Sequence, residues 1–172
     1  WDPSVDSIVN TLAFDGTTIY AGGNFTMANG LIRNYLAAID PDTGEATSFN
    51  PGADNQVLAL TLSGTTLYAG GWFTNIGGQS RNRIAALDTT TGLATGWNPN
   101  ANNDVFTILL DGTTLYAGGN FTSIGGQPRN YIAALDTTVN TNNATDWNPD
   151  AVGNIVYTIA LNGLTLYVGG GF

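Results

Sequence analysis

Short apolar runs, separated by turn residues, recur along the whole chain. In the clearest example, Val105 to Leu110 and Thr113 to Ala117 are apolar, β-prone runs that flank Asp111-Gly112. An Asp-Gly pair between two such runs is the strongest short-range signal for a β-hairpin. The matching pairs are Asp15-Gly16, Ser63-Gly64 and Asn162-Gly163. The pattern therefore predicts one hairpin at each of these four places.

A third predicted strand follows each of the first three hairpins. In the example above it is Arg129 to Asp136, which comes after a predicted loop from Ile124 to Gln127. A turn and an aromatic-x-Pro step then close the unit. The equivalent third strands are Arg33 to Asp40 and Arg81 to Asp88, and the closing steps are Phe49-Asn-Pro51, Trp97-Asn-Pro99 and Trp147-Asn-Pro149. Each unit thus contains three clear strands and a short fourth.

The whole pattern repeats with a nearly constant period. A motif of the type Leu-Tyr-Ala-Gly-Gly-x-Phe begins at Ile19, Leu67, Leu115 and Leu166, so the spacings are 48, 48 and 51 residues. No stretch of ten residues shows the apolar spacing of a helix. Periods of about 40–50 residues with a Gly/aromatic motif are typical of β-propeller blades. A β-solenoid is the alternative, but its coils are usually shorter and lack tight Asp-Gly hairpins.

The sequence therefore predicts an all-β fold, a β-propeller built from four-stranded blades of about 48 residues. The units are approximately 4–51, 52–99, 100–149 and a partial 150–172, which makes about three and a half blades in an open or partial ring. Trp1-Asp-Pro3 matches the end of a preceding unit.

Packing between blades explains several recurring residues. A blade has neighbours on both faces, so Ala85-Ala86 and Ala133-Ala134 are expected near the axis, where the sheets approach most closely. Trp97 is expected to fill the wider outer gap between two blades. Gly118-Gly119 lies inside a strand pattern, which predicts a bulge or a close approach of backbone.

These motifs resemble the delta-60 type repeat of bacterial secreted and surface proteins. The resemblance covers nearly the whole chain and includes Tyr-Ala-Gly-Gly-x-Phe-Thr, Ile-Gly-Gly-Gln-x-Arg-Asn, Ala-Ala-Leu-Asp and aromatic-Asn-Pro. It implies a β-propeller, usually inside a much larger chain. Ala86-Leu-Asp88 through Thr91-Gly92 to Trp97 is also similar to the blade motif of quinoprotein propellers, although the Gly-to-Trp spacing is one residue longer here. Neither resemblance implies a function for this chain.

Composition narrows the classes of partner. Only 10% of the residues are charged, and four Arg against 13 acidic residues give a net charge of -9. Nucleic acid is excluded because there is no basic stripe, and an anionic membrane surface would repel the chain. No apolar run is long enough for membrane insertion. The Lys-free, acidic composition, rich in Thr, Asn and Gly, suggests an extracellular or cell-surface protein.

Three arginines recur in register and are candidate ligand-binding residues. Arg33, Arg81 and Arg129 are 48 residues apart, and a ring of guanidinium groups would suit anionic sugars or carboxylates. The alternative is structural: each Arg pairs within its own blade with turn carbonyls or with a repeat acid. Those acids are Asp40, Asp88 and Asp136. Residues locked to the repeat register favour the structural interpretation.

Two further candidates break the repeat. Trp72 stands where the other units have Asn24, Asn120 and Gly171, so it could stack on a sugar or fill space against a neighbour. Asp40, Asp42 and Glu45 offer three carboxylates in one turn, which is a weak candidate for a calcium site. The equivalent turns lack the extra acids, so a plain turn is favoured. No cofactor is expected.

The sequence lacks the residue pairs of common catalytic sites. There is no His and no Cys, and Glu45 is the only Glu. We therefore expect a non-enzymatic structural or binding scaffold that acts by protein–protein interaction, as a segment of a larger secreted or cell-surface bacterial protein. A carbohydrate-binding propeller is the first alternative. A quinoprotein-like enzyme is the second, and it requires a polar axial pocket with converging carboxylates.

The number of units leaves an expected gap in the ring. Closed propellers have about four to eight blades, so three and a half blades should leave an apolar blade face exposed. Other blades of the same longer chain are the favoured partner for that face. Further protein subunits are the alternative, including a second copy that would bring the total to about seven blades. A glycan is a possible additional partner.

Overall fold

The computed structural model describes residues 2–151 and 153–171, and it shows an all-β chain. We call residues 4–51, 52–99, 100–149 and 150–172 modules 1 to 4. The predicted end of a preceding unit at Trp1 and the last motif residue, Phe172, lie outside the described residues. Among the described residues there is no helix, and hence no helix that could cross a membrane.

Each of modules 1 to 3 contains a three-stranded antiparallel sheet, and module 4 contains a two-stranded one. Module 1 has β1 (Val9–Phe14), β2 (Ile19–Gly23) and β5 (Leu36–Ile39). Module 2 has β6 (Val57–Ser63), β7 (Thr66–Gly71) and β10 (Ile84–Asp88). Module 3 has β11 (Val105–Asp111), β12 (Thr114–Gly119) and β15 (Ile132–Asp136). Module 4 has β16 (Val156–Asn162) and β17 (Thr165–Gly170).

The short fourth strand is reduced to a single β-bridge in each complete module. These bridges join Ile39 to Ala46, Leu87 to Ala94 and Leu135 to Ala144. The bridge residue lies just before the aromatic-x-Pro step, where the chain leaves one module for the next. The four predicted hairpins are confirmed, since the first two strands of every module pair with each other.

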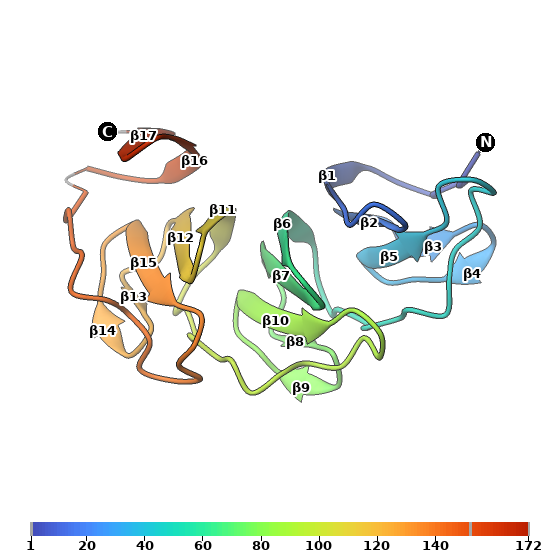
Figure 1. The fold of residues 1–172 in the computed structure, drawn as a ribbon, viewed down its shortest axis with the longest axis horizontal. Coiled ribbons are helices and arrows are strands. Elements are labelled where there is room, and N and C mark those ends of the chain that lie inside the picture. Colours follow the sequence, from blue (N-terminus) through green and yellow to red (C-terminus); the bar gives the residue numbers. More distant parts are fainter. Residues whose placement is uncertain (1, 152, 172) are drawn as a thin grey trace.

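The four sheets stand side by side along an open arc, as the blades of a propeller do (Figure 1). The first strand of each module is innermost: β1 lies against β6, β6 against β11, and β11 against β16. The third strands β5, β10 and β15 lie farther out. The expectation that Ala85-Ala86 and Ala133-Ala134 pack near the axis is therefore wrong, because these residues belong to the third strand.

The first strand of the next module can pack closely near the axis because the second strand carries a Gly-Gly pair. An added Cβ at Gly118 would lie 2.5 Å from the Val156 side chain of module 4, and one at Gly119 would lie 2.0 Å from the backbone oxygen of Asp104. Only glycine lets the next module's first strand approach so closely. The pairing register shifts between Val105 and Thr107, so the predicted bulge is confirmed.

The predicted loop at Ile124 to Gln127 is in fact a small hairpin. It consists of β13 (Ser123–Ile124) and β14 (Gln127–Pro128), joined by two glycines with φ values of 63° and 79°. Tight two-residue hairpin turns need positive φ, which glycine adopts freely. The same hairpin is β3 (Met27–Ala28) with β4 (Leu31–Ile32), and β8 (Asn75–Ile76) with β9 (Gln79–Ser80).

The third strand begins three residues later than the sequence pattern predicts. In module 3 it starts at Ile132, because Tyr131 has a φ of 65° and ends the extended backbone. The Tyr131 N–H donates to the Phe121 carbonyl, and its own carbonyl accepts from the Gly119 N–H. Arg129 and its equivalents therefore lie in a corner before the strand, and their side chains are free to bond elsewhere.

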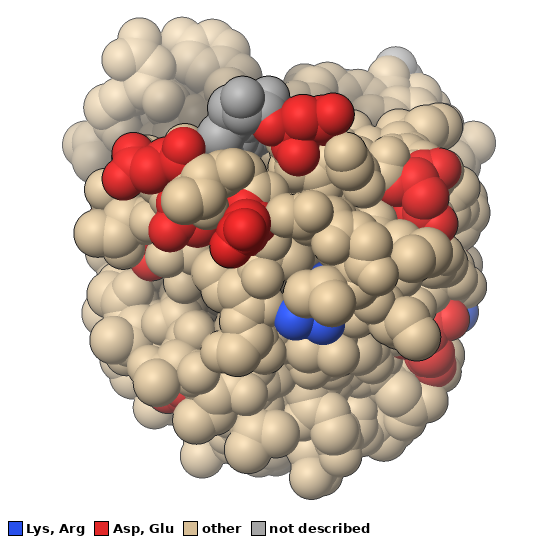
Figure 2. All heavy atoms as spheres, turned by 90° about the vertical axis from the view of Figure 1, so that its right-hand side faces the viewer, with Lys and Arg blue, Asp and Glu red and all other residues tan. Residues whose placement is uncertain are grey.

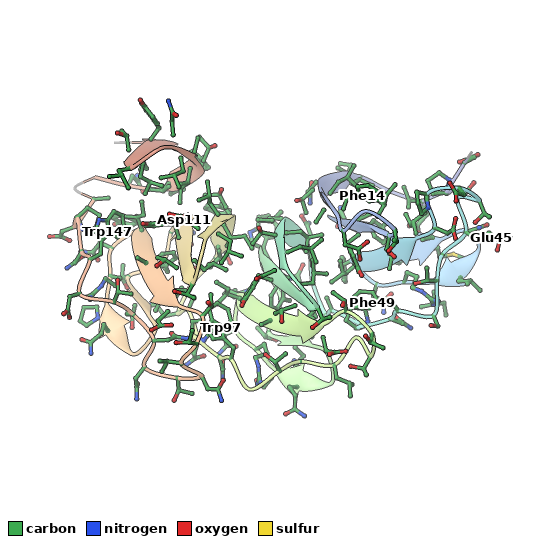
Figure 3. All side chains as sticks on the ribbon, in the orientation of Figure 1. Phe14, Glu45, Phe49, Trp97, Asp111 and Trp147 are labelled. Atoms are coloured by element: carbon green, nitrogen blue, oxygen red, sulfur yellow. The ribbon has the colours of Figure 1, made fainter. Side chains whose placement is uncertain are left out.

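The outer gap between modules is filled by aromatic pairs. Figure 3 labels one member of each pair: Phe49, Trp97 and Trp147. Trp97 is buried between modules 2 and 3, edge-on to Tyr68 with ring centroids 5.2 Å apart. Its Nε1–H donates to the Asp136 carbonyl of module 3 at 3.1 Å. The predicted role of Trp97 is thus confirmed. Tyr20 with Phe49 and Tyr116 with Trp147 form the equivalent pairs.

Candidate functional site

The arc leaves an unpaired surface at its N-terminal end, which we call the N-terminal face: Val9, Leu12 and Phe14 of β1. The Leu12 side chain is 63% exposed. Its equivalents Leu60, Ile108 and Ile159 are only 8–9% exposed, because each packs on the preceding module. Phe14 lies on the open side of β1 (Figure 3). A shallow apolar hollow of about 280 Å³ lies beside these residues.

A second unpaired surface lies between modules 3 and 4. This third-strand groove has a volume of about 420 Å³ and is lined mainly by Ile132, Trp147, Pro149, Leu166 and Val168. Among the described residues module 4 has no third strand, so Trp147 is 38% exposed whereas Trp97 is 3% exposed. The groove is therefore the space that a third strand fills in the complete modules.

The C-terminal end of the arc is also uncovered, on the other face of β17. We call this the C-terminal face: Thr158, Tyr167 and Gly169. Tyr167 is 56% exposed, whereas its equivalent Tyr20 is 3% exposed beneath module 2. Both ends of the arc thus expose apolar side chains that the same repeat buries internally.

The three candidate arginines bind backbone carbonyls in their own modules. In each, Nη1 donates to the carbonyl of the preceding residue at 2.8 Å. Nη2 reaches the residue just after the β-bridge: Arg33 to Thr47 at 2.6 Å, Arg81 to Thr95 at 2.7 Å, and Arg129 to Thr145 at 2.6 Å. These bonds tie the corner before the third strand to the chain segment that leaves the module.

The carboxylates Asp40, Asp42 and Glu45 lie in the turn after β5. Figure 3 shows Glu45 at the outer edge of module 1. Asp40 accepts from the N–H groups of Thr43 and Asp42, which lower the pKa of its carboxyl group. Asp88 and Asp136 hold their own turns in the same way. Among residues 2–151 and 153–171, no group of three potential metal ligands lies together.

Trp72 lies directly after β7, at the corner that leads to the β8–β9 hairpin. Its side chain is 36% exposed. Its N–H donates to the Gln56 carbonyl at 2.9 Å, and its own carbonyl accepts from Arg83. Arg83 also forms an ion pair with Asp104 of module 3 at 3.5 Å. Neighbouring Gly78 and Gln79 are exposed as well, whereas Ile76 is buried.

One recurring polar residue escaped the sequence reasoning. The Asp54 carboxylate accepts four hydrogen bonds from the backbone and side chains of Thr74 and Asn75. Partial burial would raise the pKa of Asp54, but these bonds outweigh it and lower the pKa to about 2. Asp6 and Asn102 make the equivalent contacts. Their spacing of 48 residues was the available signal.

The acidic composition is visible on the surface of the N-terminal end. Figure 2 views the outer side of module 1, and it shows several acidic side chains there, with little basic surface between them. They lie among uncharged residues, and the carboxylates that hold turns, such as Asp40, are among the acids of module 1. Electrostatics therefore do not single out a binding site there.

Comparison with known proteins agrees with the blade geometry. A family model described as "Domain of unknown function (DUF5122) beta-propeller" matches residues 66–90 and 111–150. These segments contain β7 to β10 of module 2 and β12 to β15 of module 3. The chain carries β-propeller repeats.

This propeller chain is also similar to two solved structures of computationally designed proteins. The Ika4 crystal structure has a TM-score of 0.68 at 14% identity, covering 100% of this chain and 92% of that one. The Ika8 crystal structure has a TM-score of 0.57 at 13% identity, covering 99% of this chain and 57% of that one. At these identities the likeness shows the fold alone. No curated protein matches the propeller chain.

Proposed function

We propose that the chain is a non-enzymatic propeller scaffold that binds other proteins through its unpaired blade surfaces. In this proposal it is a segment of a larger secreted or cell-surface bacterial protein with delta-60 type repeats. The third-strand groove is the observation that carries the proposal. Its lining is apolar, and among the described residues β17 pairs only with β16. A further strand can therefore add to the edge of β17, which is a common mode of peptide recognition.

The complete modules indicate what such a strand must look like. In module 3 the third strand places Leu135 opposite Leu115 and Ala133 opposite Ala117. Leu166 and Val168 of β17 hold the positions equivalent to Leu115 and Ala117. The partner is therefore an extended segment with Ala and Leu two residues apart, of the type Ile-Ala-Ala-Leu-Asp, contributed by further blades or by a separate subunit.

A peptide of residues 127–147, taken from this chain, tests the proposal. Labelled with a fluorophore, it should bind the 172-residue chain saturably, and hydrogen exchange at the amides of β17 should slow on binding. The matched control peptide carries Ala133→Asp and Leu135→Asp, which place charges against the apolar groove and should abolish binding. Equal binding of both peptides, or unchanged exchange along β17, would argue against the scaffold proposal.

The location and the lack of catalysis rest on composition. Without His or Cys, and with its acids in turns of the repeat, the chain offers no common nucleophile–base pair. A low-charge, acidic surface without Lys supports an extracellular or cell-surface position. Protease treatment of intact source cells should remove the epitope of an antibody raised against the chain, and full protection would contradict surface exposure.

Glycan binding at Trp72 is a second candidate function. It is supported by a partly exposed indole at a position where modules 1 and 3 carry Asn. Aromatic faces can stack on apolar faces of ligands while remaining partly in water. A glycan array should give hits with the wild-type chain that disappear with Trp72→Asn, and an array without hits would remove this candidate.

A further inference from the structure

At each of the three junctions between modules, a valine of the following module packs against a glycine of the preceding module. We call this glycine the seat. Added Cβ atoms at Gly22 and Gly70 would lie 2.6 Å from Val57 and 2.8 Å from Val105 of the following module. The valines Val57, Val105 and Val156 are fully buried there. The Leu or Ile three residues later reinforces the contact, since Ile108 and Ile159 also approach the seats at Gly70 and Gly118.

The chain contains a fourth such glycine and a fourth such valine, and these two do not contact each other. Gly169 is the fourth seat, and among the described residues an added Cβ there would meet only Thr158 of its own module. Val9 and Leu12 are the fourth valine and leucine, and both side chains are exposed. The seat lies on the C-terminal face and the side chains that fit it lie on the N-terminal face.

One hydrogen bond at the junction between modules 1 and 2 supports the same match. Leu60 donates its backbone N–H to Thr11 Oγ1 of module 1 at 3.2 Å. Thr158 occupies the position of Thr11 beside the empty seat, and Leu12 occupies the position of Leu60. The two faces therefore carry the same donor and acceptor positions as the junction between modules 1 and 2.

The N-terminal face and the C-terminal face of one chain do not contact each other. Leu12 and Tyr167 are each more than half exposed, so the two faces do not meet within the molecule. Figure 1 shows why: β1 and β16 stand at opposite ends of the arc, with its open side between them. Among residues 2–151 and 153–171 nothing covers either face. A head-to-tail contact between two molecules gives either a closed ring or an open filament.

We propose that two copies of this chain associate head to tail, with the N-terminal face of each seated on the C-terminal face of the other. This rests on the proposed function, because it names one protein partner of the scaffold. Each chain supplies three blades with a third strand and a fourth position that holds only β16 and β17. Two chains therefore occupy eight positions with about seven blades' worth of strands, within the range of about four to eight blades in closed propellers. Closure forms both junctions at once, which strengthens each by effective concentration.

Mass measurement in solution tests the pairing. Light scattering should give twice the 17.9 kDa chain mass for the wild type. Leu12→Glu and Tyr167→Glu each place a charge in the junction and should raise the dimer dissociation constant about 30-fold or more. Both side chains are exposed in the single chain, so circular dichroism should be unchanged. Leu93→Glu is the control, since Leu93 is 59% exposed and belongs to neither face.

Mixing the two variants tests the head-to-tail geometry. Leu12→Glu keeps an intact C-terminal face, and Tyr167→Glu keeps an intact N-terminal face. At a concentration where the wild type is dimeric and each variant alone is monomeric, a mixture with different fluorophores should form heterodimers through one intact junction. Dimers of Tyr167→Glu alone would indicate that two N-terminal faces pair, and would overturn the proposal. A monomeric wild type, or species larger than a dimer, would overturn it too.

The peptide experiment on the third-strand groove separates this inference from the proposed function. That groove lies on the opposite face of β17 from Gly169, so Leu12→Glu should leave peptide binding unchanged. If the chain is monomeric but binds the peptide, the scaffold proposal stands and the pairing proposal falls. If the chain dimerises but the peptide does not bind, the reverse holds.

Discussion

Trp97 and Trp147 occupy the same position in consecutive repeats, so replacing each by Ala isolates the contribution of the neighbouring module. Trp97 is enclosed between modules 2 and 3, while Trp147 borders the open groove beside module 4. Each has a tyrosine of its own module edge-on to it, at 5.2 and 5.4 Å. What differs is the third strand and turn of the next module.

The expected cost of Trp97→Ala follows from what the side chain contacts. Removing a buried Trp leaves a cavity and typically costs about 3–5 kcal/mol. That figure includes the edge-on contact with Tyr68, worth about 0.5–1.5 kcal/mol, and the hydrogen bond to Asp136, worth about 1 kcal/mol. Trp147→Ala removes a side chain that water already reaches and leaves an open groove, so about 1–2 kcal/mol is expected.

Urea denaturation followed by circular dichroism measures both free energies of unfolding. Trp97→Phe is the matched control, because module 1 carries Phe49 at this position. Phe keeps most of the apolar contact and loses the Nε1 hydrogen bond, so it should cost about 1–2 kcal/mol. Equal losses for the two Ala variants would refute the argument that the following module, rather than the local chain, buries this aromatic residue.

Four further substitutions test the remaining contacts. Because the folded pKa of Asp54 is about 2 and its ordinary value is 3.8, its stabilising effect is present above pH 3.8 and is lost as the pH falls through about 2. In acid unfolding, Asp54→Asn should therefore weaken the pH dependence of stability in that window, and Asn102→Asp should strengthen it. Gly118→Ala should cost about 1–3 kcal/mol by overpacking against Val156, detectable as a lower urea midpoint, and an unchanged midpoint would refute the close approach. Arg81→Lys should lower stability by about 1–3 kcal/mol in the same assay, since an ammonium group cannot span both carbonyls, and no change would count against that bridging role.

Much of the local structure could be predicted because it is encoded within a few residues. The Asp-Gly, Ser-Gly and Asn-Gly pairs set the hairpins, and the Gly-Gly pairs set the bulges. The corner at Tyr131 could not be predicted, because nothing in the Arg-Asn-Tyr-Ile run distinguishes it from a strand. The anchoring role of Asp54 repeats at a spacing of 48 residues and was detectable, but its partners are 20 residues away and only the fold brings them together.

Sequence alone determined the repeat, its period, its strands and its aromatic closing step, because each depends on side-chain alternation and turn chemistry within one module. Only the tertiary structure decided which strand faces the axis and which surfaces remain uncovered. Leu12 and Leu60 are the same residue in the same repeat position, yet one is exposed and the other buried. The physical reason is that burial in a propeller depends on the adjacent module, and that module lies about 48 residues away in the chain or in another molecule.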